Sequence, residues 1–143
     1  MARKVCVFLL LTAALVFAFS TGAEAARQSF GPFSVDVPRG WQIAETNNQL
    51  TFTAPDESAV LTIVVEEIEG TSLKAVAEAF AEEMGGPKPV AAEGLFHFTY
   101  EEDGVKCNAI VQKIDGTDIY TVIVAAGEHP ELEGMLESFE TAN

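Results

Sequence analysis

The spacing of apolar residues changes twice along this chain, and this change constrains the fold more than any other feature. Over most of residues 33–126, apolar side chains alternate with polar ones or form short β-branched runs, which is typical of strands. Residues 71–86 and 129–139 instead place them at i, i+3, i+4 and i+7, the period of an amphipathic helix. The sequence therefore predicts an α+β fold, a mainly antiparallel sheet of about six to seven strands with two helices packed on it.

Turn residues divide the strand-forming part into short segments. Pro38-Arg39-Gly40 ends the first alternating run, and Asp115-Gly116 is a strong signal for a two-residue hairpin. Residues 59–65 are apolar almost without a break, so they predict a central strand that is covered on both faces. The expected strands are residues 33–37, a short strand from Trp41, and residues 50–54, 59–65, 95–100, 105–114 and 118–126.

Both expected helices have end signals. Thr71 or Ser72 can cap the first helix, and the glycine pair that opens residues 85–93 ends it, so this segment predicts an irregular connection. In the second helix Pro130 suits the first helical position. Gly134 lies inside that helix, where glycine costs about 1 kcal/mol relative to alanine, and close packing on the sheet would explain it.

The first 25 residues have the pattern of a secretion signal. Arg3 and Lys4 precede an apolar run over residues 5–19. Ala23-Glu24-Ala25 then gives the small-x-small pattern that signal peptidase cleaves. We therefore treat this segment as removed from the folded protein.

Cleavage is expected between Ala25 and Ala26, which leaves a single domain over residues 26–143. A retained membrane anchor is the alternative, but the apolar run of about 15 residues is shorter than the roughly 20 that a spanning helix needs. The sequence thus predicts an exported protein with no stable membrane anchor after cleavage. Its compartment would be the periplasm, or the medium in a cell with one membrane.

Removal of residues 1–25 leaves an acidic domain with one cysteine. The 8 basic and 22 acidic residues of the full chain become 6 and 21, so the formal net charge changes from −14 to −15. A negative field of this size repels phosphate backbones and anionic lipid surfaces, which argues against nucleic-acid and peripheral membrane binding. Cys107 alone cannot form an internal disulfide, so the exported domain depends on its apolar core.

The sequence contains no recognisable motif for catalysis, metal binding or cofactor binding. It has no G-x-S-x-G, glycine-rich phosphate loop, C-x-x-C, H-E-x-x-H or calcium loop with alternating Asp and Asn. We therefore predict no catalytic residues, no metal ligands and no cofactor, and expect that the protein is not an enzyme. Cys107 shares one strand face with Val105, Ala109 and Val111, which predicts a buried thiol. A hydrolase is the alternative if His97 or Cys107 meets an acid in a cleft.

Other residues have a structural and a functional interpretation. Trp41, the only tryptophan, is expected to close one end of the core, with a role in stacking on a ligand as the alternative. His129 precedes the second helix and is expected to cap it. The acidic clusters at residues 66–69, 82–83 and 101–103 are expected to be solvated, with a weak divalent-ion site between two of them as the alternative.

The order and boundaries of these segments resemble the PsbP-like superfamily, which includes DcrB-like proteins of the bacterial envelope. The opening F-S-V-D-V-P-R-G-W of residues 33–41 is similar to the family's F-x-hydrophobic-P-x-G-W. The helix start at Ser72-Leu73, the hairpin at Asp115-Gly116-Thr117 and the closing M-L-E-S-F of residues 135–139 fit the same pattern. The resemblance covers about residues 30–140.

This resemblance implies an antiparallel sheet with helices against it in an α/β/α-type sandwich. It also implies a role without catalysis, because members of the family mostly bind or stabilise partners. The chain lacks the lipid-attachment cysteine of many bacterial members, which argues against lipid anchoring. We expect an accessory or interaction protein of the cell envelope with an unidentified protein partner. The alternative is a carrier of a small ligand or metal ion, with a pocket near Trp41 or between helix and sheet.

Overall fold

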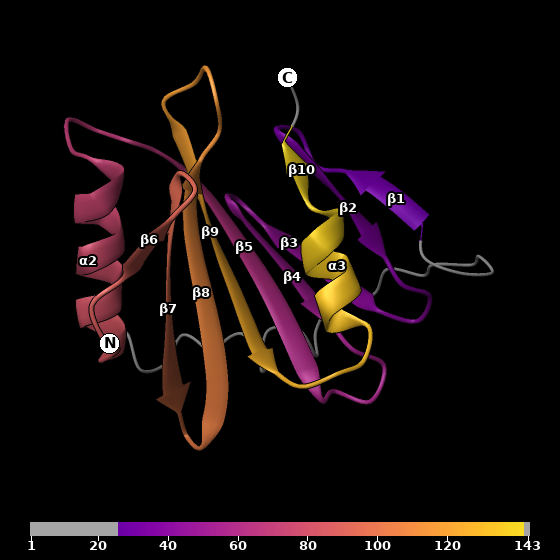
Figure 1. The fold of residues 1–143 in the computed structure, drawn as a ribbon. Helices are drawn as coiled ribbons and strands as arrows, with labels where there is room; N and C mark the ends of the chain where they lie inside the picture. The colour runs from indigo at the N-terminus through magenta and orange to yellow at the C-terminus, as the bar shows by residue number, and fades with distance from the viewer. Residues whose placement is uncertain (1–25, 142–143) are drawn as a thin grey trace.

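The computed structural model describes residues 26–141, which form a large antiparallel sheet, a small sheet and two helices (Figure 1). The predicted α+β class, with a mainly antiparallel sheet and two helices, is confirmed. The expected signal segment, residues 1–25, lies outside the described residues, so cleavage between Ala25 and Ala26 stays a prediction. The large sheet has seven strands, in the spatial order β3 (Gln42–Thr46), β4 (Gln49–Thr53), β5 (Ala59–Glu67), β9 (Ile119–Gly127), β8 (Val105–Lys113), β7 (Leu95–Glu102) and β6 (Val90–Ala92).

A second, three-stranded sheet contains the predicted strand Phe33–Val37. This strand, β2, lies between β1 (Ala26–Ser29) and β10 (Glu140–Thr141), and both pairs are antiparallel. Arg27 ties the three strands together, because its guanidinium donates to Asp36 Oδ1 at 2.9 Å and also to a carboxylate oxygen of Glu140. Strands β1 and β10, the first and last of the described chain, thus lie on the two sides of β2.

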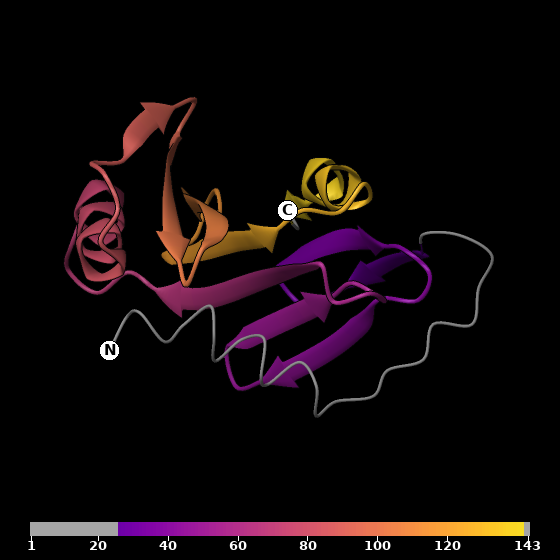
Figure 2. The same cartoon turned by 90° about the horizontal axis from the view of Figure 1, so that it is seen from below.

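The two helices cover opposite faces of the large sheet (Figure 2). Alternate residues of a strand point to opposite faces, so Ile123 and Val124 of β9 belong to two different apolar layers. Helix α2 (Leu73–Met84) buries Ala77, Ala81 and Met84 against the face of Val124. Helix α3 (Leu132–Ser138) packs against β2 and buries Leu132 and Met135 in the layer of Ile123. The structure therefore has the predicted layers, with α2 on one face of the large sheet. On the other face, α3 and the small sheet together form the outer layer.

Helix α2 has the end signals that the sequence predicts. The Ser72 hydroxyl accepts a hydrogen bond from the Ala75 backbone N–H at 3.1 Å, which satisfies one of the unpaired donors of the first turn. Gly85 ends the helix in the left-handed conformation, with φ of 71°. The predicted cap and stop are confirmed.

Helix α3 starts later than predicted, at Leu132 instead of Pro130. His129 Nδ1 accepts a hydrogen bond from the Glu131 backbone N–H at 3.1 Å. This bond lies in the turn before the helix, whose N-cap residue is Glu131 with no side-chain cap hydrogen bond, so the prediction that His129 caps the helix is wrong. The residues between His129 and Leu132 form a turn, which shortens the helix at its start.

The connection predicted as irregular over residues 85–93 contains a short strand. Val90–Ala92 forms β6, which pairs antiparallel with the start of β7. The turn between them is Glu93-Gly94, and both residues have positive φ, 46° and 84°. Two such residues match the twist of a tight hairpin, a pattern that is more familiar from Asn-Gly and Asp-Gly.

The hairpin predicted at Asp115-Gly116 is present, but its loop is wider than two residues. Ile114 N–H donates to Ile119 O at 2.9 Å, so residues 115–118 form the loop. The Thr117 hydroxyl donates to Ile114 O at 2.7 Å and accepts from Ile119 N–H at 3.1 Å. This side chain supplies the backbone contacts that a two-residue turn would supply otherwise, which explains the longer loop.

Gly134 is not explained by close packing, contrary to the prediction. No atom lies within 4 Å of the position that a Cβ would take there, and the residue lacks a positive φ. The glycine therefore costs helix stability without a packing role.

We expect Gly134→Ala to raise the free energy of unfolding by about 0.5–1 kcal/mol, since alanine restricts the unfolded chain and favours the helix. Urea unfolding followed by circular dichroism measures this change. An unchanged or lowered midpoint would show that the space beside Gly134 is needed.

Candidate functional site

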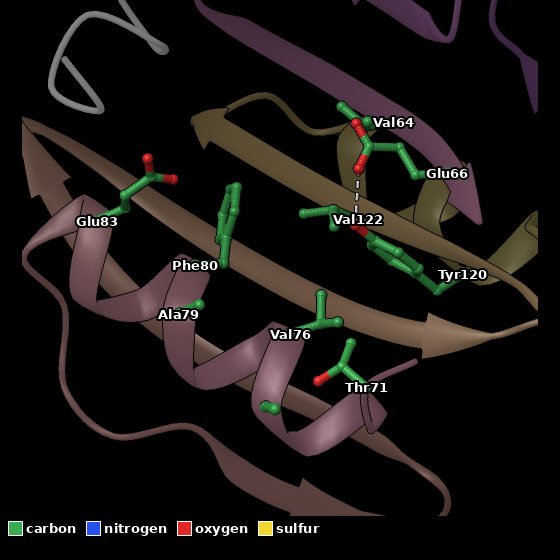
Figure 3. Close-up of a pocket in the computed structure, with 10 residues that line it drawn as sticks. Val64, Glu66, Thr71, Val76, Ala79, Phe80, Glu83, Tyr120 and Val122 are labelled. Carbon is green, nitrogen blue, oxygen red and sulfur yellow. Dashed lines mark hydrogen bonds between the residues drawn. The ribbon is translucent and has the colours of Figure 1, made fainter. Parts of the chain in front are cut away.

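A groove of about 670 Å³ lies between α2 and the strands β5 and β9 (Figure 3). Its floor is apolar, with Val64 from β5 and Val122 from β9 as direct neighbours in the sheet register. Val76 and Phe80 of α2 form the facing wall. The remaining lining residues are Glu66, Thr71, Ala75, Ala79, Glu83 and Tyr120.

The groove follows from the spacing of residues on α2. The helix buries the stripe of Ala77, Ala81 and Met84, and the neighbouring stripe faces the groove. In that stripe the side chains of Ala75 and Ala79 are exposed and small, so they leave space where larger side chains would fill it. The helix itself contacts β7 and β8, which leaves the side toward β5 open.

One end of the groove contains a fixed carboxylate. Tyr120 OH donates to Glu66 Oε2 at 2.7 Å, and Asn48 Nδ2 donates to Glu66 Oε1 at 3.1 Å. Glu66 and Tyr120 are register partners on β5 and β9, so the backbone places them side by side. Burial, together with the hydrogen bond to Glu66 and its charge, raises the pKa of Tyr120 to about 12.

Because of Tyr120, we expect the free energy of unfolding to depend on pH above pH 10. Because its pKa rises from 10.0 to about 12 in the folded protein, the folded state binds the proton more tightly than the unfolded chain. The stabilising contribution is complete below pH 10 and is lost as the pH rises toward 12. We expect the free energy of unfolding to fall less steeply over this range in Tyr120→Phe than in the unchanged protein, as measured by urea unfolding at each pH. Equal slopes would contradict the raised pKa of Tyr120.

The other end of the groove is acidic too. Glu83 lies there, two helical turns from Val76, while Glu66 and Tyr120 lie at the opposite end (Figure 3). The last turn of α2 has no basic residue, and the exposed Glu82 adds a second carboxylate beside the groove. Within residues 26–141, no Lys or Arg lines the groove. The site therefore combines an apolar middle with negative charge at both ends.

Two smaller grooves lie on the face of α3. One of about 470 Å³ lies between the Phe30–Phe33 turn and the Thr46–Gln49 hairpin. The other, of about 280 Å³, lies between Phe139 near the end of α3 and the strands β7 to β9. Neither has the continuous apolar wall that α2 gives to the first groove.

Trp41 lies in the core, as predicted, with 1% of its surface exposed. Its Nε1–H donates to Glu131 Oε1 at 3.2 Å, and its ring meets the His129 ring edge-on at a centroid distance of 5.3 Å. The residue contributes to none of the three grooves described above. The structure thus places Trp41, for which ligand stacking was the alternative role, away from the candidate site.

Cys107 and His97 point to opposite faces of the sheet. Cys107 is buried beneath α2, as predicted, and its Sγ lies 3.7 Å from the Val105 carbonyl oxygen. His97 is exposed and pairs with Ile110 on the neighbouring strand. The structure therefore places His97 and Cys107 apart, and neither lines any of the three grooves described above.

The acidic clusters are exposed except at one position. Glu102 is only 7% exposed, and its Oε1 has no hydrogen-bond partner within residues 26–141. The prediction of full solvation is wrong there, because Glu102 follows Phe98 and Tyr100 on the buried side of β7. Across the described part of the chain, no three His, Cys, Asp or Glu side chains gather as a metal site would require. None of the helices described there has the length and apolar character needed to span a bilayer.

Comparison with known proteins finds similarity in structure alone. No protein-family model and no curated protein matches the chain. The Ran-binding protein Mog1p of Saccharomyces cerevisiae aligns over 81% of this chain and 95% of its own, with 11% identity and a TM-score of 0.52. This likeness shows that the two proteins share their fold.

Two further solved structures align with lower TM-scores. LpqN of Mycobacterium tuberculosis, described as involved in cell envelope biogenesis, aligns over 86% of this chain and 88% of its own, with 12% identity and a TM-score of 0.47. A protein of Bacteroides thetaiotaomicron aligns over 78% of this chain, with 16% identity and a TM-score of 0.47. The match spans only 45% of that longer chain.

Proposed function

We propose that this chain is an exported interaction protein of the cell envelope without catalytic activity, and that it binds a protein partner in the groove between α2 and the sheet. The main observation in support of this proposal is the apolar groove. Val64, Val76 and Phe80 present apolar surface there, while half of the lining residues are exposed. Apolar surface that is accessible and bordered by charged groups is typical of sites for partners.

The fold and the sequence motifs support this proposal. Mog1p is a Ran-binding protein, so a protein with this fold serves protein binding elsewhere. Membership of the PsbP-like superfamily, with its DcrB-like envelope proteins, is part of the proposal and is supported by the opening motif of residues 33–41. Export is supported by the pattern that ends at Ala25 and is tested by amino-terminal sequencing of the mature protein, which should begin at Ala26.

A small-molecule carrier is the second candidate, because the groove volume of about 670 Å³ lies within the range of ligand pockets. Such pockets usually enclose most of their ligand. This groove is open along its length, with Ala75 and Ala79 exposed on one side and Glu66 on the other. The open form favours a protein partner over an enclosed small molecule.

Site-specific photo-crosslinking tests the proposal. A benzophenone side chain at residue 79 would lie in the groove, whereas the same group at residue 108 would lie on an exposed position of β8 outside it. In cells of the native host we expect one reproducible crosslinked protein from position 79 and none from position 108. The same products from both positions, or no product from position 79, would contradict binding in the groove.

A further inference from the structure

We infer that the segment bound in this groove is an amphipathic helix with an apolar face and a Lys or Arg near each end of that face. The inference rests on the proposed function, because it assigns the chemistry of the partner to the same groove. Three observations carry it: the hydrogen bonding of the strands that line the groove, the shape of α2, and the distribution of charge.

The hydrogen bonding of the groove favours a helical guest over an extended one. Strand β5 pairs with β4 and β9, and β9 pairs with β5 and β8, so both strands of the floor have neighbours on each side. The backbone of α2 is bonded within the helix, with cap bonds to the Ala75 N–H at its start and to the Ala81 and Glu82 carbonyls at its end. An extended peptide would find no free strand edge there, and its own backbone groups would lose water without a partner. A helix satisfies these groups internally.

The shape of the groove suits a helix that lies beside α2. Ala75 and Ala79 are one turn apart on the exposed stripe of α2, and small side chains let two helices approach closely. Strands lie about 4.8 Å apart and packed helices about 10 Å apart, so one helix covers about two strands. Helix α2 contacts β7 and β8, which leaves Val64 and Val122 of the next two strands for a second helix (Figures 2 and 3).

The negative charges of the groove favour basic residues in the bound helix. Glu66 lies at one end, where Tyr120 and Asn48 hold both its oxygens, and Glu83 lies at the other. The negative end of the α2 dipole adds to the charge of Glu83, because the last turn contains no basic residue. The whole chain carries a formal net charge of −14, so no distant positive field opposes this pattern.

The length of the groove sets the spacing of these basic residues. Its lining runs from Thr71, just before α2, to Glu83 in the last turn of the helix. At about 1.5 Å per residue, the helical part from Leu73 to Glu83 is roughly 15 Å long. A guest helix of about 12 residues, with its two cationic side chains about three turns apart, would match both acidic ends.

Two labelled synthetic peptides test the inference against the full chain. Both have the same Leu and Ala face over about three turns, and they differ only in carrying Lys or Glu at the two ends of that face. We expect fluorescence anisotropy to show binding of the Lys peptide at least about tenfold tighter than that of the Glu peptide, and weaker as salt is raised. Circular dichroism should show that the Lys peptide becomes helical when bound.

A matched pair of variants locates the charge effect. Glu83→Lys reverses a charge in the groove, and we expect it to weaken the Lys peptide about tenfold. Glu101→Lys makes the same charge reversal at an exposed position of β7, outside the lining of the groove and on the other face of the sheet, and should have less than about a threefold effect. Unchanged circular dichroism of both variants shows that they fold.

Several results would overturn the inference: equal binding of both peptides, binding of neither, an extended bound peptide, or equal effects of the two substitutions. Self-association of the chain at this groove, seen in sedimentation, would overturn it as well. These outcomes leave the proposed function standing if a partner still crosslinks at residue 79. The proposed function fails separately if crosslinking at that position recovers no partner.

Discussion

Gly127→Ala is expected to lower the free energy of unfolding by on the order of 4 kcal/mol, or to prevent folding altogether. Gly127 ends β9 with φ of 81°, and a Cβ there would lie 2.2 Å from the backbone oxygen of Ser58. That oxygen also accepts a hydrogen bond from Glu128 N–H at 3.2 Å, so it cannot move away without losing this bond. Urea unfolding followed by circular dichroism measures the loss.

Gly116→Ala is the matched control. Gly116 has φ of 76°, similar to that of Gly127, but no atom lies within 4 Å of its Cβ position. This substitution should cost only the left-handed conformation, about 1–2 kcal/mol. The difference between the two variants therefore measures the steric clash with Ser58. Equal losses would show that this contact relaxes at little cost.

Much of the large sheet could be predicted because its strands have clear periodicity. The apolar run of residues 59–65 predicts a central strand, and Ala59–Ile63 is buried on both faces between β4 and β9. The alternation around Cys107 predicts its burial, since Ala109 and Val111 share its face. In these segments the strand period itself determines which side chains reach the core.

The parts that could not be predicted depend on contacts between distant segments. Strands β1 and β10 are short and polar, and they pair with β2 from the two ends of the described chain, where Arg27 also joins Asp36 to Glu140. Strand β6 depends on a turn at Glu93-Gly94, whose left-handed glutamate is not a usual turn signal. The sequence around each of these segments does not indicate which distant residues will contact it.

The candidate site could be predicted only in part, because periodicity gives the face of a residue but not the distance between elements. The helical period places Val76 and Phe80 on the side of α2 near the sheet, and both pack partly buried against the apolar layer there, but they also line an open groove. A signal was present in the exposed Ala75 and Ala79, which are too small to close the space toward β5. The pairing of Glu66 with Tyr120 required the register between β5 and β9, which sequence alone does not specify.

Trp41→Ala is expected to lower the free energy of unfolding by about 3–5 kcal/mol, the usual cost of removing a large aromatic side chain from a core. Trp41 is 1% exposed and packs with Phe52 and Met135 in the layer between the two sheets. Trp41→Phe keeps most of this apolar contact but loses the bond to Glu131 Oε1, so a loss of about 1–2 kcal/mol is expected. Circular dichroism must follow unfolding, since the variants lack the only tryptophan. A loss below about 1 kcal/mol in Trp41→Ala would contradict the core role, while unchanged peptide binding in Trp41→Phe would separate that role from the groove on the opposite face.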